Sequence, residues 1–553
     1  MLQNNPTLKS LINSLWNTLW SGGVANPLTA IEQITYLLFM KRLDELEVER
    51  EAATEFSHEG YRSKFTGEYI PYVDQSEYVI SDNMTDEEKA SIMNAYNEAK
   101  KPRQKAELRW GQFKTITPKE KLLEHVRYNV FPFLKGLNGR TSSFTKYMEN
   151  AVFIIEKPAL LLEAINKIEE IYVEIEKDAS EKGHAFQDIQ GDVYEMLLSE
   201  IAQAGKNGQF RTPRHIIRLM AELVKPQVGD KIADPACGTA GFLLGAYQYI
   251  QTECTRRKDA SKLEIDDDGF EKGTFSAILD ETVKNELDNS FYGFDIDVTM
   301  VRLALMNLMM HGIDNPQIEY KDTLSRSYDE AGTYDIVFAN PPFTGKIDKG
   351  DVHPGLRVDT SSSELLFLDR ISTMLRNGGK AAVIIPEGVL FGSQKAQKQI
   401  REILLKDCCL EAVISLPSGV FKPYTGVKTA ILLFTKVEQN SSRWNTERVW
   451  FYELNSDGYS LDDNRRRLKG YPLPEAKSKY ENREYDLQED RKTYFYVQIA
   501  EIEGNDLDLS YNRYKEYVYE EQTYDPPKEI LSKLLVLEKE ILRDMDELNS
   551  LIG

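Results

Sequence analysis

The sequence predicts an α/β fold: a mostly parallel, Rossmann-like sheet with a helical domain before it and a helical tail after it. Short apolar strands ending in small or acidic residues alternate with apolar helices from about residue 230 to 436. The stretch Asp230–Phe242 reads as strand, tight turn and helix, which is the first βα unit of such a sheet. Helical spacing dominates on both sides. We expect a helical domain over 1–185, a sheet domain over 186–440 and a C-terminal segment over 441–553.

Composition indicates an ordinary globular protein. A chain of 553 residues with 41% hydrophobic content is long enough for several domains. Its four cysteines show neither paired nor Cys/His spacing, so neither a disulfide framework nor a metal site is expected. The start of the chain lacks a leader pattern, and the most apolar run, Ile34–Met40, is too short to cross a bilayer. We expect a cytoplasmic protein with no membrane contact.

The net charge of −21 bears on any role with nucleic acid. A protein that grips a duplex by itself normally presents a basic face. If this chain acts on DNA, we expect another subunit to supply most phosphate contacts. The alternative is an acidic surface that is merely solvated, with local basic patches sufficient for binding.

The N-terminal region reads as helices. Apolar residues from Leu8 to Leu19 lie on one helical face, and Gly22-Gly23 ends the pattern. Asn26 is expected to cap a second helix that starts at Pro27. The region up to residue 185 contains no phosphate-binding GxxxxGK[ST] motif, which favours a packing or assembly role.

Three acidic residues follow predicted strands, where open α/β sheets hold their ligands. Asp234 opens a turn that departs from GxGxxG at Ala240, which argues against a dinucleotide. Asp295 ends the strand Ser290–Phe294, at the place where such folds put an acid for ribose hydroxyls. Asp322 ends a third strand, although it could equally be a turn cap.

The stretch Thr333–Phe343 is an apolar strand that runs into two prolines. The Asn340 amide oxygen and the Pro341 carbonyl would then form a double acceptor for one NH2 group, and Phe343 would offer a flat face to a planar base. Such an arrangement suits an exocyclic amine. The alternative is that Asn-Pro-Pro only ends a strand and begins a loop.

The string Asn340-Pro341-Pro342-Phe343 resembles the catalytic motif of the amino-group DNA methyltransferases, and the resemblance extends along most of the chain to the modification subunits of type I restriction-modification systems. It implies that the sheet domain is an S-adenosylmethionine-dependent methyltransferase domain. It also implies a site-specific enzyme that methylates the N6 amine of an adenine flipped out of double-stranded DNA, with Asn340, Pro341, Pro342 and Phe343 catalytic.

Gly208 to Arg214 is similar to the segment with which this family holds the cofactor before the sheet, and Thr212 is expected to cap the helix that Pro213 starts. Capping alone would also explain Thr-Pro. The resemblance implies no metal, and it implies a cofactor site made of Gln209, Phe210, Arg211, Thr212, Pro213, Arg214, Asp234, Gly238, Thr239, Ala240, Gly241, Asp295 and Asp322.

The remaining chain completes the sheet and adds a tail. We expect strands at 380–386, 410–417 and 429–436, a lapse of the sheet pattern after about residue 440, and an insertion within 252–289. The cluster Arg465-Arg466-Arg467 is either a phosphate or partner contact or a solvated turn. A last helix from Asp525 carries an apolar stripe that could contact a partner or dock on its own sheet domain.

The resemblance implies partners. A specificity subunit would bind two copies of this chain, and a restriction subunit would join for cleavage. The alternatives are a stand-alone methyltransferase acting on adenine or on cytosine N4, a protein-glutamine or RNA-guanine methyltransferase, and a scaffold without catalysis. Intact motifs in sequence order argue against the scaffold.

Overall fold

A computed structural model gives the structure of the chain. It describes residues 5–24, 26–57, 62–81, 84–139, 141–182, 212–273, 281–438, 444–463, 465–486, 491–516 and 527–552. The expected cofactor residues Gln209, Phe210 and Arg211 lie outside the described residues.

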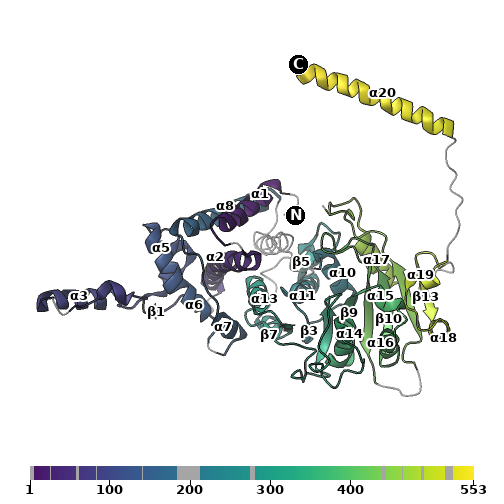
Figure 1. Cartoon of the computed structure of the whole chain (residues 1–553), viewed down its shortest axis with the longest axis horizontal. Coiled ribbons are helices and arrows are strands. Elements are labelled where there is room, and N and C mark those ends of the chain that lie inside the picture. The colour runs from purple at the N-terminus through teal and green to yellow at the C-terminus, as the bar shows by residue number, and fades with distance from the viewer. Residues whose placement is uncertain are drawn as a thin grey trace.

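The N-terminal region is helical, as predicted, and forms the purple-to-blue part of Figure 1. The Asn26 side chain accepts a hydrogen bond from the Thr29 N–H (3.3 Å) at the start of α2, and Ile34, Leu37 and Leu38 of that helix are buried. The elements are α1 (Pro6–Ser21), α2 (Pro27–Ser57), β1 (Glu68–Tyr69), α3 (Asp86–Ala99), β2 (Arg103–Gln104), α4 (Trp110–Phe113), α5 (Lys119–His125), α6 (Phe131–Lys135), α7 (Ser143–Met148) and α8 (Pro158–Lys182).

A nine-stranded sheet follows, in the order β13-β12-β10-β11-β9-β8-β3-β6-β7. It is mostly parallel, as predicted: only β11 and β13 run against their neighbours. The strands are β3 (Ile232–Asp234), β6 (Phe291–Asp295), β7 (Gln317–Tyr320), β8 (Tyr334–Ala339), β9 (Leu375–Pro386), β10 (Cys408–Ser415), β11 (Thr429–Lys436), β12 (Arg448–Glu453) and β13 (Tyr494–Gln498).

Helices cover both faces of the sheet. Because side chains alternate along a strand, Ile336 and Phe338 of β8 face one core while Val337 and Ala339 face the other. The first face packs against α10 (Arg214–Val224), α11 (Gly241–Asp259) and α13 (Val298–Met310). The second packs against α14 (Ser363–Met374) and α16 (Lys395–Lys406).

The chain leaves β3 for β6 and β7 on one side, and later returns to place β8 on the other side of β3. The topology therefore switches between β3 and β8, and ligands of open α/β sheets bind outside the carboxyl ends of the strands at such a point.

The predicted lapse of the sheet after residue 440 is wrong. Strands β12 and β13 extend the sheet, and Trp450 and Phe451 of β12 are buried. Both strands are short aromatic runs, which suit a half-buried pleated surface. Between them lie α17 (Pro472–Glu481) and, after β13, α18 (Ile499–Gly504) and α19 (Tyr511–Tyr514).

Part of the insertion after α11 forms a hairpin of β4 (Leu263–Ile265) and β5 (Glu271–Gly273), and α12 (Glu281–Leu287) leads back to the sheet. Within this insertion, Arg256 pairs with Glu253 and Glu271. Asp268 accepts a hydrogen bond from Tyr459.

Two of the three arginines in the cluster after β12 form ion pairs with other residues of this chain. Arg465 pairs with buried Asp457, and Arg467 lies 3.6 Å from Asp268. Arg466 is exposed. Arg465 therefore closes the 457–467 loop on itself, and Arg467 ties this loop to the β4–β5 hairpin. Neither of the two expectations for this cluster included these roles.

The helical region docks on the β7 edge of the sheet through α13. Arg302 of α13 pairs with Glu32 of α2 at 2.7 Å, and both side chains are nearly buried. Arg50, further along α2, pairs with Asp314, which follows α13, at 2.9 Å. These ion pairs join the two regions in one body (Figure 1).

Helix α20 (Pro527–Ile552) lies apart from the other described elements in Figure 1. Nine of its apolar side chains are 54–59% exposed: Leu531, Leu534, Leu535, Val536, Leu537, Ile541, Leu542, Met545 and Leu548. The alternative in which this stripe docks on its own sheet domain is therefore not what the structure contains. Among the described helices, none is both long enough and apolar enough to span a membrane.

Candidate active site

Asn340 directly follows β8 at the carboxyl edge of the sheet, beside the switch point. Its Nδ2 donates a hydrogen bond to Thr212 Oγ1 at 2.9 Å. Its Oδ1 is buried and meets no hydrogen-bond donor among the described residues. A buried acceptor without a partner costs free energy, and in native proteins such a group usually serves a function or meets a ligand. The amide is thus held by its donor end while its acceptor end is unused.

Thr212 does not cap the following helix, which corrects the prediction. Helix α10 begins at Arg214 with Pro213 at the cap position and no side-chain cap bond. The Thr212 side chain is 6% exposed and is turned to Asn340 instead. The Thr-Pro pair in the sequence therefore marks a contact with Asn340 and not a helix cap.

Pro341 is buried, and among the described residues no hydrogen bond reaches its carbonyl. Phe343 differs from expectation: the side chain is only 6% exposed, and its ring meets Phe421 edge to face at 5.6 Å. The flat face predicted for a base is therefore covered in this structure. Phe421 comes from the segment after β10, so this aromatic pair joins the ends of two strands that β9 and β11 separate in the sheet.

The turn after β3 begins with Asp234, which is 1% exposed and accepts a hydrogen bond from the Ala236 N–H at 3.0 Å. Burial raises the pKa of Asp234 to about 8. Gly238 and Ala240 both have positive φ (52° and 62°), and the space beside Gly238 is open. Asn307 of α13 supports the turn through Thr239 O at 2.7 Å. Left-handed backbone at a non-glycine residue is strained and is often found at ligand sites.

Asp295 lies at the end of β6 next to this turn. Its Oδ2 accepts the Gly238 N–H (3.0 Å) and its Oδ1 accepts the Asp297 N–H (2.9 Å). Burial raises the pKa of Asp295. Each carboxylate oxygen can accept a second bond, so the group can still receive hydroxyl donors.

Ile296 is a residue that the sequence reasoning missed. It follows Asp295, yet its side chain is 69% exposed at the sheet edge. An exposed apolar side chain beside a polar acceptor is a suitable surface for a flat ring. The signal was an apolar residue immediately after the last acid of a strand.

Asp322 belongs to the neighbouring turn. Its Oδ1 accepts the Leu324 N–H at 2.9 Å, so the turn-cap alternative describes at least one of its roles. Thr323 Oγ1 donates to Pro235 O at 3.1 Å and ties this turn to the one after β3. The turns after β3, β6 and β7 are thus joined by hydrogen bonds.

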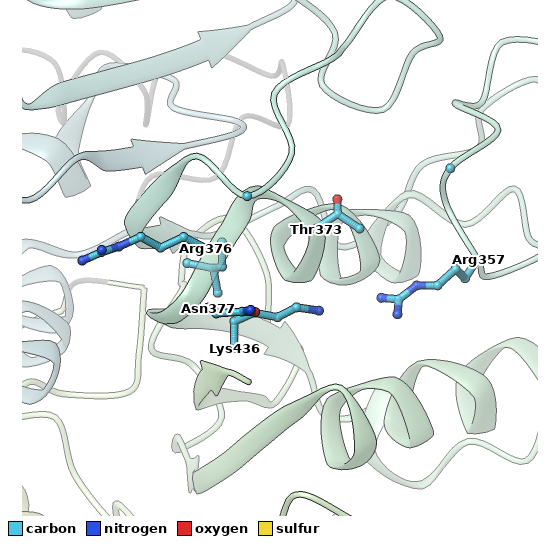
Figure 2. Close-up of a pocket in the computed structure, with 8 residues that line it drawn as sticks. Arg357, Thr373, Arg376, Asn377 and Lys436 are labelled. Atoms are coloured by element: carbon cyan, nitrogen blue, oxygen red, sulfur yellow. The ribbon is translucent and has the colours of Figure 1, made fainter. Parts of the chain in front are cut away.

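A hollow of about 480 Å³ lies at the opposite edge, where the parallel strands begin (Figure 2). Arg357, Arg376 and Lys436 line it. Arg357 pairs with Asp369 and Asp407, and Arg376 pairs with Asp335, so two of these cations are already neutralised. The hollow is remote from Asn340 because it lies at the other end of β8. Within the described ranges, no cluster of His, Cys, Asp and Glu could hold a metal ion.

Comparison with known proteins agrees with this geometry. A family profile described as N-6 DNA Methylase matches residues 185–523. The chain belongs to the N-6 DNA methylase family. A second profile, the HsdM N-terminal domain, matches residues 8–168, and the sequence resemblance to type I modification subunits is confirmed.

Among curated relatives of this N-6 DNA methylase, the type I restriction enzyme EcoEI methylase subunit of Escherichia coli is 33% identical over 60% of this chain and 62% of that protein. The EcoKI methylase subunit of Escherichia coli K12 is 34% identical over 48% of each chain. The chain therefore matches about half to three fifths of the length of these curated relatives.

Solved structures show the same fold. One chain from a study of complex assembly and conformational transition of the type I R-M system has a TM-score of 0.61, 25% identity and 99% coverage of both chains. The methyltransferase subunit of a type I restriction-modification system from Streptococcus thermophilus has a TM-score of 0.59 and 20% identity, covering 92% of this chain and all of that one. The predicted fold class, a methyltransferase sheet with a helical N-terminal region, is confirmed.

Proposed function

We propose that this chain is the catalytic modification subunit of a type I restriction-modification system. It transfers a methyl group from S-adenosylmethionine to the exocyclic N6 amine of an adenine flipped out of double-stranded DNA, in the cytoplasm, and so protects host DNA. The observation that carries the proposal is the buried Oδ1 of Asn340 at the switch point of the sheet, which has no hydrogen-bond partner among the described residues.

Catalysis rests on two acceptors. The lone pair of an adenine amine is delocalised into the ring, so the amine is a poor nucleophile. Asn340 Oδ1 and the Pro341 carbonyl would each accept one of its hydrogens, which favours a pyramidal nitrogen with its lone pair available for attack. Orienting the amine in this way is the main contribution of the protein.

The family membership implies S-adenosylmethionine, and the residues fit it. Asp295 can accept the ribose hydroxyls, the exposed Ile296 side chain can pack against the adenine ring, and the open side of Gly238 leaves room for close approach. We assign the remaining contacts with the cofactor to Thr212, Pro213, Arg214, Asp234, Thr239, Ala240, Gly241 and Asp322. We assign further contacts to Gln209, Phe210 and Arg211, which lie outside the described residues. When bound, the cofactor supplies a methyl group on a sulfonium. The target nitrogen would take this methyl group while the carbon–sulfur electron pair stays on sulfur, and the proton that the nitrogen then loses would pass to water.

Two features of the chain support its assembly with partner subunits: its net charge and the exposed helix α20. A body at −21 is repelled by duplex unless a more basic partner holds it there. The exposed apolar stripe of α20 is a suitable contact for a specificity subunit that binds two copies of this chain, with a restriction subunit joining for cleavage. Removing residues 527–553 should then weaken assembly by at least about 100-fold and leave cofactor affinity unchanged.

The decisive experiment is Asn340→Ala, with Asn377→Ala as a matched control at the other edge of the sheet. With the subunits copurified, transfer of tritiated methyl to DNA should fall by about 1000-fold or more in Asn340→Ala only. Calorimetry should show unchanged cofactor affinity in both variants. Turnover retained by Asn340→Ala would remove this residue from the mechanism and with it the proposal.

A further inference from the structure

We infer that Thr212 is a positioning residue that holds the Asn340 amide by its NH2 end, so that the amide oxygen is presented to the substrate amine. This inference rests on the proposed function. It assigns to Thr212 a role toward the target amine, in addition to or in place of contact with the cofactor.

The need for such a residue comes from the chemistry of the amide. The oxygen and NH2 ends of an asparagine have nearly the same size, so packing alone selects poorly between the two orientations. Only one orientation accepts a hydrogen from adenine. In the other, the Asn340 NH2 would face the substrate NH2, and two donors would be opposed without an acceptor.

Thr212 anchors the amide. A hydroxyl can pair with either end of an amide, and here the Thr212 oxygen lies 2.9 Å from Asn340 Nδ2 and accepts its hydrogen, so Oδ1 points away from Thr212 and meets no donor among the described residues. The contact joins residues 128 positions apart in a part-buried setting, where a hydrogen bond is stronger than in water. With an amine bound at Oδ1, this is the only orientation in which both ends of the amide are paired.

The position of Thr212 is itself fixed by the first turn of α10. His215 lies 2.8 Å from Asp457 Oδ2 through Nε2, and its ring stacks on Tyr459 with centroids 4.4 Å apart. Asp457 is 1% exposed and also pairs with Arg465. Because the 457–467 loop holds the start of α10, the Thr212 hydroxyl has little freedom to leave Asn340.

The test compares Thr212→Val, which keeps the shape and removes the hydroxyl, with Thr212→Ser, which keeps the hydroxyl. Thr333→Val, at the opposite end of β8, is the control. We measure three quantities on the copurified complex: the single-turnover methylation rate with saturating cofactor, the cofactor dissociation constant by calorimetry, and the melting temperature. Thr212→Ala is a second hydroxyl-free variant in case Thr212→Val folds poorly.

The expected result is a single-turnover rate about 10- to 100-fold lower in Thr212→Val, within about threefold of normal in Thr212→Ser, and unchanged in Thr333→Val. Cofactor affinity should change less than about threefold throughout. An unchanged rate in Thr212→Val overturns the inference. So does a loss shared by Thr212→Ser, or one abolished by raising the cofactor concentration, since Thr212 would then act in packing or in cofactor binding.

The two proposals fail separately. If Asn340→Ala retains turnover, the proposed function fails whatever Thr212 does. If Asn340→Ala is inactive while Thr212→Val methylates at the normal rate, the proposed function stands and only the role of Thr212 is lost.

Discussion

The two edges of the sheet differ in whether their polar groups already have hydrogen-bond or ion-pair partners. At the carboxyl edge, Asn340 keeps a buried acceptor that meets no donor in the described part of the chain, and Gly238 borders open space. At the amino edge there is a hollow of about 480 Å³ with a cationic lining, but Arg357 and Arg376 are already paired with carboxylates. Volume and positive charge alone do not make a site. Unused hydrogen-bonding capacity at the switch point is the better indicator here.

The largest effect on stability is expected at the amino edge, from Arg357→Met. Asp369 is fully buried and would lose the guanidinium that lies 2.7 Å away. Removing one partner of a buried ion pair should lower the free energy of unfolding by about 3 kcal/mol. Denaturant unfolding measures the loss, and calorimetry should show unchanged cofactor affinity. A weaker cofactor affinity without loss of stability would mark the hollow as a ligand site and break the comparison.

At the carboxyl edge, Asp295→Ala should weaken binding of S-adenosylmethionine by about 10- to 100-fold, because the ribose hydroxyls lose a charged acceptor. Calorimetry on the purified chain measures this directly. If the affinity does not change, the acceptor is Asp297, two residues further along.

Asp234 should make stability depend on pH. Burial raises its pKa from 3.8 to about 8, so the folded state favours the protonated carboxyl. Its contribution is fully present below the unfolded pKa of 3.8 and is lost as pH rises through about 8. Asp234→Asn cannot titrate, so its melting temperature should fall by a few °C less than that of the natural chain between these values. Parallel melting curves across the pH range would contradict this.

The smallest effect is expected from Lys436→Ala. This side chain lines the hollow. Methyl transfer, cofactor affinity and melting temperature should all stay within about twofold or 1 °C of the natural chain, as for other surface changes. A tenfold loss of methylation would give the amino edge a catalytic role.

Much of the fold could be predicted because its signals are local. Strands β3, β6, β8 and β11 are apolar runs that end in acids, prolines or turn residues, and the structure places them within a few residues of the prediction. Strands β12 and β13 were missed because their aromatic runs are separated by a long segment without βα spacing. Their place in the sheet is set by pairing with β10 and with each other.

The candidate site divides in the same way. The sequence predicted Asn340, Asp295 and Gly238 as site residues because each lies at the end of a predicted strand or in the turn that follows it. The bond from Asn340 to Thr212 could not be predicted, since it depends on where α10 packs. The burial of Phe343 likewise depends on Phe421, which arrives from a different strand end. Local motifs identify the groups, and the tertiary fold decides which atoms remain unpaired.

The exposed apolar stripe of α20 has a consequence for how many copies of this chain a cell can make. Nine apolar side chains that are more than half exposed form a patch that another copy of the same chain can cover. If α20 docks on the proposed specificity subunit, copies made in excess of that partner would compete with each other for burial of this helix. The cell would then need to balance the synthesis of the two proteins, because surplus copies of this chain would increase the risk of aggregation.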